Sequence, residues 1–159
     1  MMSIIVDIQI ETTAKNLPTT ADIEQWCSCA LQPPCAASTD DEEPLEMTVR
    51  IVDEEESAEL NSDYRGKSGP TNVLSFPFES PPEVKINLLG DLVICAPVVE
   101  REAQQQNKSA QAHWAHMVIH GTLHLQGFDH IEDEEATIME DIETRIIQGL
   151  GFPPPYESE

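Results

Sequence analysis

The chain has 159 residues, of which 40% are hydrophobic and 24% are charged, and these values fit one globular domain with one core. Eight Lys and Arg against thirty Asp and Glu give a formal net charge of −22, which taken alone argues against nucleic acid as a partner, because binding to phosphates relies on Lys and Arg. No stretch approaches the roughly 20 apolar residues of a membrane helix, and the N-terminus lacks the basic region of a secretory signal. We therefore expect a cytoplasmic protein without membrane contact.

Hydrophobic periodicity and capping residues divide the chain into four strands and five helices. The expected strands cover residues 3–10, 45–52, 71–78 and 88–96. The expected helices cover residues 21–31, 53–61, 97–106, 110–125 and 132–149. Ser109 is a suitable cap for the fourth helix, and Pro77 favours an edge position for the third strand. This order predicts an α+β fold, a single domain over residues 1–159 with a mixed, roughly four-stranded sheet packed with helices.

The histidines are concentrated in one short segment. All five fall within residues 113–130, at positions His113, His116, His120, His124 and His130. Residues four apart share one face of a helix, so two imidazoles at this spacing can bind the same metal ion. Two pairs meet this condition: His116 with His120, and His120 with His124.

Gly127 distinguishes between the two pairs. A glycine here permits the chain to turn back after the helix, so that His130 can return toward the helix end that carries His124. His116 lies about 12 Å from that end at a rise of about 1.5 Å per residue. We therefore predict that His120, His124 and His130, the histidine trio, bind one ion. Three protein ligands with an open position are typical of catalytic zinc sites.

Three other polar residues of this segment are not expected to bind the ion directly. His113 and His116 are expected to be ordinary core or surface histidines. His116 is also a candidate for orienting a ligand from outside the ligand set, as is Asp129, which precedes His130.

The spacing of the trio occurs in the metzincin proteases, whose motif is H-E-x-x-H-x-x-G-x-x-H. This chain matches every histidine of that motif and its glycine, and it predicts a zincin-like metal-binding helix. Gly121, however, stands where the motif has glutamate. That glutamate is the general base of peptide hydrolysis, and a glycine cannot accept a proton. The sequence therefore argues against a protease of this kind.

A second resemblance extends over much more of the chain. The segment H-G-T-L-H-L-Q-G-F-D-H at residues 120–130 resembles the signature of the YbeY family of bacterial endoribonucleases. Residues 64–67 (Y-R-G-K), 70–77 (P-T-N-V-L-S-F-P) and 89–94 (L-G-D-L-V-I) resemble further motifs of that family, in the family's order. The resemblance covers roughly residues 45–150. It implies a metal-dependent, single-strand-specific endoribonuclease that acts in ribosomal RNA maturation, including the 3′ end of 16S ribosomal RNA, and in ribosome quality control.

The same resemblance implies roles for individual residues. The histidine trio would hold the ion, and Arg65 would be the essential catalytic cation. A planar guanidinium suits this role, because phosphodiester cleavage requires neutralisation of the non-bridging oxygens. Arg65 and Lys67 fall in an expected loop over residues 63–70, and both are candidates for RNA binding. The implied partners are ribosomal RNA, small-subunit ribosomal proteins and an RNA-binding GTPase.

Two alternative functions remain open from the sequence. One is a metallohydrolase of another class, such as a metalloprotease, and Gly121 counts against it. The other is a non-catalytic ribosome assembly factor, which the open coordination position disfavours. Zinc is the expected ion, but imidazoles also suit nickel and other divalent transition metals. If RNA is the substrate, the net charge of −22 requires a locally positive cleft around Arg65 and Lys67.

Overall fold

The sheet is mixed and has four strands. A computed structural model describes residues 4–15, 17–31, 45–78, 88–128 and 133–153. The strands are β1 (Ile4–Glu11), β2 (Leu45–Val52), β3 (Val73–Pro77) and β4 (Leu88–Cys95). Their order in the sheet is β1-β2-β4-β3. The first three in that order run parallel, and β3 pairs antiparallel with β4 at the edge.

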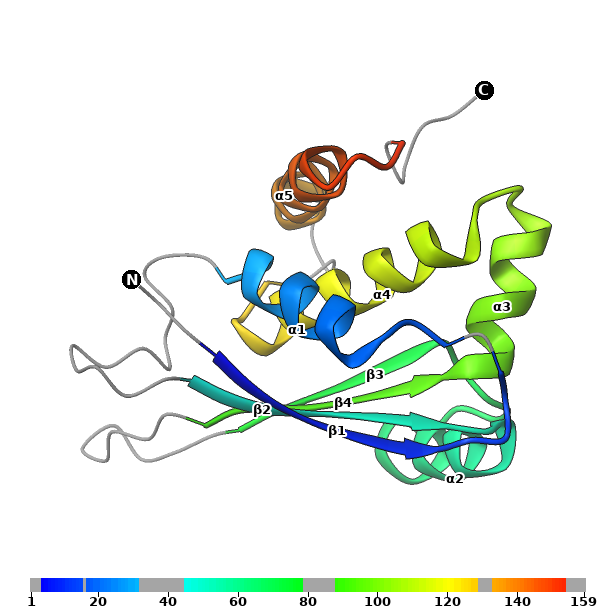
Figure 1. The fold of residues 1–159 in the computed structure, drawn as a ribbon. Coiled ribbons are helices and arrows are strands. Elements are labelled where there is room, and N and C mark those ends of the chain that lie inside the picture. The colour runs from blue at the N-terminus through cyan, green and yellow to red at the C-terminus, as the bar shows by residue number, and fades with distance from the viewer. Residues whose placement is uncertain (1–3, 16, 32–44, 79–87, 129–132, 154–159) are drawn as a thin grey trace, which may run out of the picture.

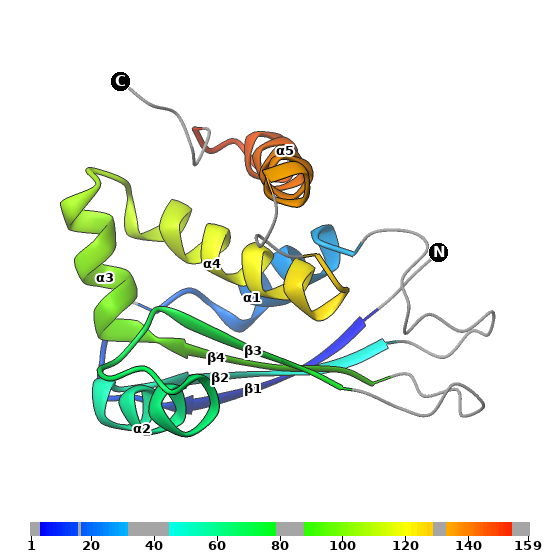
Figure 2. The ribbon, with the colours of Figure 1, turned by 180° about the vertical axis from the view of Figure 1, so that it is seen from behind.

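Five helices in the described part of the chain form layers around this sheet. They are α1 (Thr20–Cys29), α2 (Glu54–Arg65), α3 (Ala96–Gln105), α4 (Ala110–Leu125) and α5 (Asp133–Gly149). Helices α1 and α4 cover one face, α2 lies against the other, and α3 stands at one end of the sheet (Figure 1). Helix α5 packs on the outer side of α4, so α4 lies between α5 and the sheet (Figure 2).

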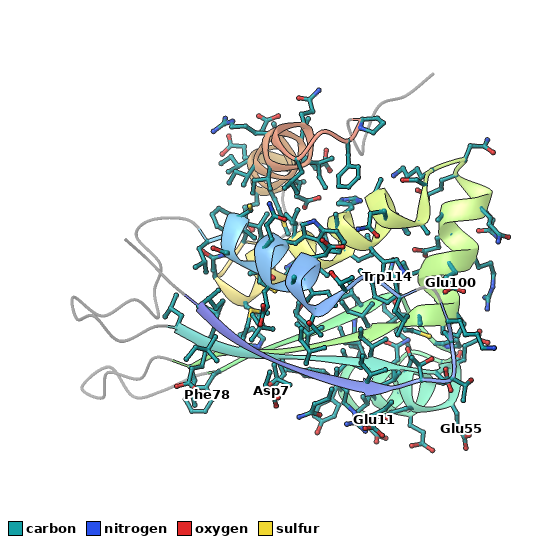
Figure 3. The ribbon with its side chains drawn as sticks, viewed as in Figure 1. Asp7, Glu11, Glu55, Phe78, Glu100 and Trp114 are labelled. Atoms are coloured by element: carbon teal, nitrogen blue, oxygen red, sulfur yellow. The ribbon has the colours of Figure 1, made fainter. Side chains whose placement is uncertain are left out.

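The core lies between the sheet and the layer formed by α1 and α4. Strand β2 alternates as its sequence predicts, with Leu45, Met47, Val49 and Ile51 all buried in the main hydrophobic cluster. Trp114 of α4 fills the space between helix and sheet (Figure 3). The histidine-bearing helix is therefore held on its sheet side by the core of the protein.

Most of the expected elements are confirmed. The described residues form one α+β domain with a mixed four-stranded sheet, as predicted. Pro77 does lie on an edge strand, where its missing N–H removes no ladder hydrogen bond. Ser109 caps α4, since its side chain accepts a 3.1 Å hydrogen bond from the backbone N–H of Ala112.

The C-terminus of α2 differs from the prediction. The sequence placed the end of this helix near Asn61 and a loop over residues 63–70, whereas the helix continues to Arg65. Asn61 does not end the helix because its buried side chain donates a 2.8 Å hydrogen bond to the carbonyl of Gly69. Gly66 ends it instead. Arg65 therefore lies on the last turn of a helix, and only Lys67 lies in the following loop.

The described residues contain no disulfide and no helix with the length and hydropathy needed to span a bilayer. Cys27 and Cys95 are buried free thiols, and Cys29 is an exposed one. Burial raises the pKa of Cys27 to about 12, so its thiol stays protonated and packs as a small apolar group.

Candidate metal centre and active site

Helix α4 places four of the five histidines at intervals of three or four residues. Its N-cap at Ser109 and the turn at Gly127, which has a φ of 102°, bound a helix of 16 residues. Side chains four apart lie on one face, so His116, His120 and His124 form a row along the helix. The first two rings of this row lie 6.0 Å apart between centroids, and the last two 4.6 Å apart.

His120 and His124 direct the same ring nitrogen toward each other. Their Nε2 atoms are 3.1 Å apart. His124 Nδ1 donates to the carbonyl oxygen of Phe128 at 2.8 Å, and His120 Nδ1 donates to the carboxylate of Glu143 at 2.9 Å. Both partners are acceptors, so each ring donates through Nδ1, and the tautomer with its proton on Nδ1 has its lone pair on Nε2.

Two lone pairs at this distance repel unless a cation lies between them. Two imidazole nitrogens on one tetrahedral zinc ion, each about 2.0–2.1 Å from it, are themselves separated by roughly 3.3 Å. The 3.1 Å separation of the Nε2 atoms of His120 and His124 is close to that value. The donor set, its tautomers and its spacing therefore fit a zinc-type ion.

Glu143 on α5 belongs to the candidate site, and the sequence prediction missed it. Its side chain is fully buried and joins two histidines of α4, accepting from His116 Nε2 at 2.7 Å and from His120 Nδ1 at 2.9 Å. A signal was present, because Glu143 lies four residues from each of the buried residues Met139 and Ile147. A carboxylate in the middle of an apolar helical stripe requires a buried partner.

His116 is buried, its Nε2 is hydrogen-bonded to Glu143, and its ring centroid lies 6.0 Å from that of His120. Burial lowers the pKa of the His116 imidazole, and the hydrogen bond to Glu143 partly opposes this effect. Both carboxylate oxygens of Glu143 are thus held by α4, which fixes the tautomer of His120 and the orientation of its ring. His116 lies where a residue that orients a ligand would lie.

A different set of ligands is also geometrically available. His116, His120 and Glu143 offer ligand atoms that all lie within 4.8 Å of one another, so these three could hold an ion. The atoms concerned include those that already form the two buried hydrogen bonds. An ion there would have to replace both bonds in a place that solvent hardly reaches, since Glu143 is 0% and His116 6% exposed. The pair His120 and His124 faces open space and suits catalysis better.

That open space is a cavity of about 780 Å³ between α4 and the end of α2. Its walls come from α2, from β3 with the residues before it, and from the C-terminal end of α4. The lining residues are Tyr64, Arg65, Asn72, Val73, Leu74, Ser75, Phe76, Pro77, His120, His124, Gly127 and Phe128. The fold thus places Arg65 in the same cavity as His120 and His124, although more than fifty residues separate them in the sequence.

Local hydrogen bonds hold the Arg65 side of the cavity in place. The hydroxyl of Ser57 on α2 contacts both the N–H and the carbonyl of Thr71 at 3.0 Å, and Asn61 holds Gly69. These bonds fasten the segment between α2 and β3 to the helix. The predicted residue Lys67 is exposed in this segment and is not part of the cavity lining, while Asp129 and His130 lie outside the described residues.

Ion pairs distinguish two groups of cations on and near α2. Arg50 pairs with Glu56 at 2.5 Å, and Arg101 pairs with Glu54 at 2.6 Å. Within the described ranges, Arg65 and Lys67 form no ion pair and are exposed. Their charges are therefore available to a ligand.

Gly121 has a structural reason to be glycine. A Cβ built at this position would lie 2.7 Å from Cδ2 of Leu92 and 3.2 Å from Cγ2 of Val73, both on the sheet. The carbonyl of Gly121 also lies 3.4 Å from the hydroxyl of Ser75. A side chain at this position would therefore point at β3 and β4 and would require Leu92 to shift, so a glutamate here would start toward the sheet.

His113 belongs to a separate polar contact. It is buried, and its Nε2 donates to Glu102 of α3 at 2.9 Å. The same carboxylate accepts from the amide of Asn72, which lines the cavity, at 3.0 Å. Glu102 lies on α3, so His113 helps to join α3 and α4. The facing Nε2 atoms of the candidate centre belong to His120 and His124.

Comparison with known proteins agrees with these observations. Residues 7–151 match the profile of a protein family described as endoribonuclease YbeY. The solution structure of TM1509 from Thermotoga maritima is similar in fold, with a TM-score of 0.56, 24% sequence identity and coverage of 95% of this chain and 99% of that one.

Proposed function

The chain belongs to the YbeY family of endoribonucleases, and we propose that it is a metal-dependent enzyme that cleaves single-stranded RNA. Its proposed roles are the maturation of ribosomal RNA, including the 3′ end of 16S ribosomal RNA, and ribosome quality control. The observation that carries this proposal is the shared cavity, which is lined both by His120 and His124, whose Nε2 atoms face each other, and by Arg65. It combines a place for a cation with a place for a phosphate.

The proposed ion is zinc, with nickel or another divalent transition metal as an alternative. His120 and His124 would hold it, and His130 would supply the third ligand. When bound, such an ion polarises the phosphodiester and activates water. Glu143 accepts from Nδ1 of His120, and the carbonyl of Phe128 accepts from Nδ1 of His124, so that the Nε2 atoms would be the ones that bind the ion.

Arg65 is the proposed catalytic residue for the phosphate. Its guanidinium can donate two parallel hydrogen bonds to the non-bridging oxygens and stabilise the charge that grows on them during cleavage. Lys67 is proposed to bind a neighbouring phosphate at the rim. Arg50 and Arg101 are paired with acids of α2, so Arg65 and Lys67 are the described cations that we propose for RNA binding beside the cavity.

The strongly acidic surface supports a role for partners. A chain of net charge −22 attracts free RNA poorly, whereas basic proteins bind to such a surface readily. We propose that small-subunit ribosomal proteins and an RNA-binding GTPase bring the enzyme to its substrate, ribosomal RNA, in the cytoplasm.

Activity on a single-stranded RNA from the small-subunit precursor tests the proposal. We expect cleavage that is lost with a chelator, restored by zinc, and reduced at least about a hundredfold by Arg65→Ala, since one oxyanion-stabilising donor contributes about that much. Arg145→Ala, which removes an exposed arginine of α5, is the matched control and should cleave normally. Full activity of folded Arg65→Ala, or of the chelated wild type, would exclude the proposed mechanism.

A further inference from the structure

One wall of the cavity is aromatic. Tyr64 and Phe76 both line it, and their rings meet edge to face with centroids 5.0 Å apart and an interplanar angle of 70°. Tyr64 is nevertheless 67% exposed, the most exposed of the large hydrophobic side chains in the described part of the chain. The ring is thus supported on one side and open to solvent on the other.

The support comes from a buried cluster on the α2 side of the sheet. Phe76 packs with Leu60 against Val52, Leu74 and Val93. An edge-to-face contact with such an anchored ring restricts the orientation of Tyr64 at little further cost in side-chain entropy. A large apolar ring held in this way, yet left in solvent, is a preformed stacking surface.

Tyr64 is also adjacent to the proposed phosphate-binding residue. It precedes Arg65 on the last turn of α2, and both line the same cavity. A nucleotide presents a phosphate and a flat base, connected through the sugar. A guanidinium beside an exposed aromatic ring offers a partner to each of these two groups, as in other proteins that bind single strands.

We propose that Tyr64, supported by Phe76, is a nucleobase subsite, on which the base of the nucleotide whose phosphate contacts Arg65 stacks. The inference rests on the proposed function and identifies the group that admits only single strands, because a base must be unpaired and unstacked from its neighbours to lie on the ring. Stacking requires no particular base, so the subsite selects for strandedness and not for sequence.

The test measures RNA binding in the presence of a chelator, so that cleavage does not interfere. The probe is a short single-stranded RNA with one 2-aminopurine, whose fluorescence falls on stacking. We expect Tyr64→Leu to weaken binding by about fivefold to about 150-fold, because stacking on an aromatic ring contributes about 1–3 kcal/mol per base. The fluorescence change should disappear with it. Tyr64→Phe keeps the ring and should bind like the wild type.

Two further measurements make the assignment specific. Phe78→Leu removes another exposed aromatic ring, which is 46% exposed and lies on the sheet face opposite α1 and α4, outside the cavity (Figure 3). This control should leave binding unchanged. An RNA with one abasic position should bind more weakly than the intact RNA to the wild type, and equally to Tyr64→Leu.

The subsite and the proposed function can fail separately. If the wild type cleaves RNA and depends on metal while Tyr64→Leu binds and cleaves like it, the subsite is wrong and the function stands. If no RNA is cleaved under any condition but binding still depends on the ring at position 64, the subsite stands and the catalytic proposal fails. Equal binding losses in Tyr64→Leu and Phe78→Leu would also overturn the subsite.

Discussion

Glu143 contacts two histidines of the candidate centre, although it lies on a different helix. One fully buried carboxylate accepts hydrogen bonds from His116 and His120 and thereby connects α5 to α4. A buried carboxylate is costly unless both its oxygens are satisfied, and here two imidazoles satisfy them. The same contacts decide which nitrogen of His120 is available for an ion. Packing of α5 and orientation of a ligand therefore depend on one side chain.

This dependence predicts the effect of Glu143→Gln. The variant keeps the shape of the side chain but can accept from only one imidazole through its single carbonyl oxygen. We expect a loss of zinc affinity of about 10- to 100-fold, the usual effect of removing a partner that orients a histidine ligand. Titration with zinc against a competing chelator measures this directly, and NMR of the imidazole nitrogens reports the tautomer of His120.

Asp141→Asn is the matched control for this variant. It removes one negative charge from an exposed position of the same helix and should bind zinc like the wild type. Equal affinities in Glu143→Gln and the wild type would show that Glu143 serves the packing of α5 alone.

At the scale of elements, the contact between α4 and the sheet fixes the position of the histidines. The helix lies close to β3 and β4 at Gly121, immediately after His120. This close approach directs the imidazoles of His120 and His124 into the cavity beside β3. The residue that rules out a metzincin base is therefore also the residue that allows the helix to lie where it does.

Substitution of Gly121 should destabilise the protein. In Gly121→Ala the new methyl group meets Leu92 and Val73, and overpacking of about 1–3 kcal/mol exceeds the roughly 1 kcal/mol gained in helix propensity. Gly121→Glu should lose more, because it also buries a carboxylate. Urea denaturation measures the free energy of unfolding of both variants.

Gly149→Ala serves as the reference for these measurements. This position is also helical, but nothing lies within 4 Å of an added Cβ, so the propensity gain should appear alone. Stability of Gly121→Ala equal to or above that of Gly149→Ala would show that α4 can move away from the sheet without cost.

For the whole molecule, the distribution of charge is more informative than its sum. Thirty acids against eight Lys and Arg make the protein strongly anionic. Two of those cations, Arg50 and Arg101, are neutralised by Glu56 and Glu54, while Arg65 and Lys67, beside the cavity or near it, form no ion pair with any residue that the structure describes. Of the described cations, Arg65 and Lys67 are thus the ones placed at or near the cavity to attract RNA.

A shallow salt dependence of RNA binding follows from this distribution. Two phosphate contacts to a single strand predict a slope of log K against log salt concentration of about −1.4, and loss of either cation should reduce its magnitude by about 0.7. Fluorescence titrations of chelated protein over a range of salt concentrations test this for Arg65→Ala and Lys67→Ala. A slope steeper than about −4 would mean that other cations bind the RNA.

The sequence by itself determined the elements, the α+β class and the family. Hydrophobic periodicity, capping residues and short motifs involve residues that are close in the sequence, so they can be recognised from the sequence alone. It also determined that histidines four apart share a helix face. It misplaced the end of α2, since the hydrogen bond that keeps Asn61 helical reaches a residue eight positions away. Only the tertiary structure decided that Glu143 joins His116 to His120, that Gly121 lies against Leu92, and that Tyr64 and Arg65 share a cavity with His120 and His124. Such contacts depend on how helices and strands distant in sequence pack against one another, and no local pattern of residues records that packing.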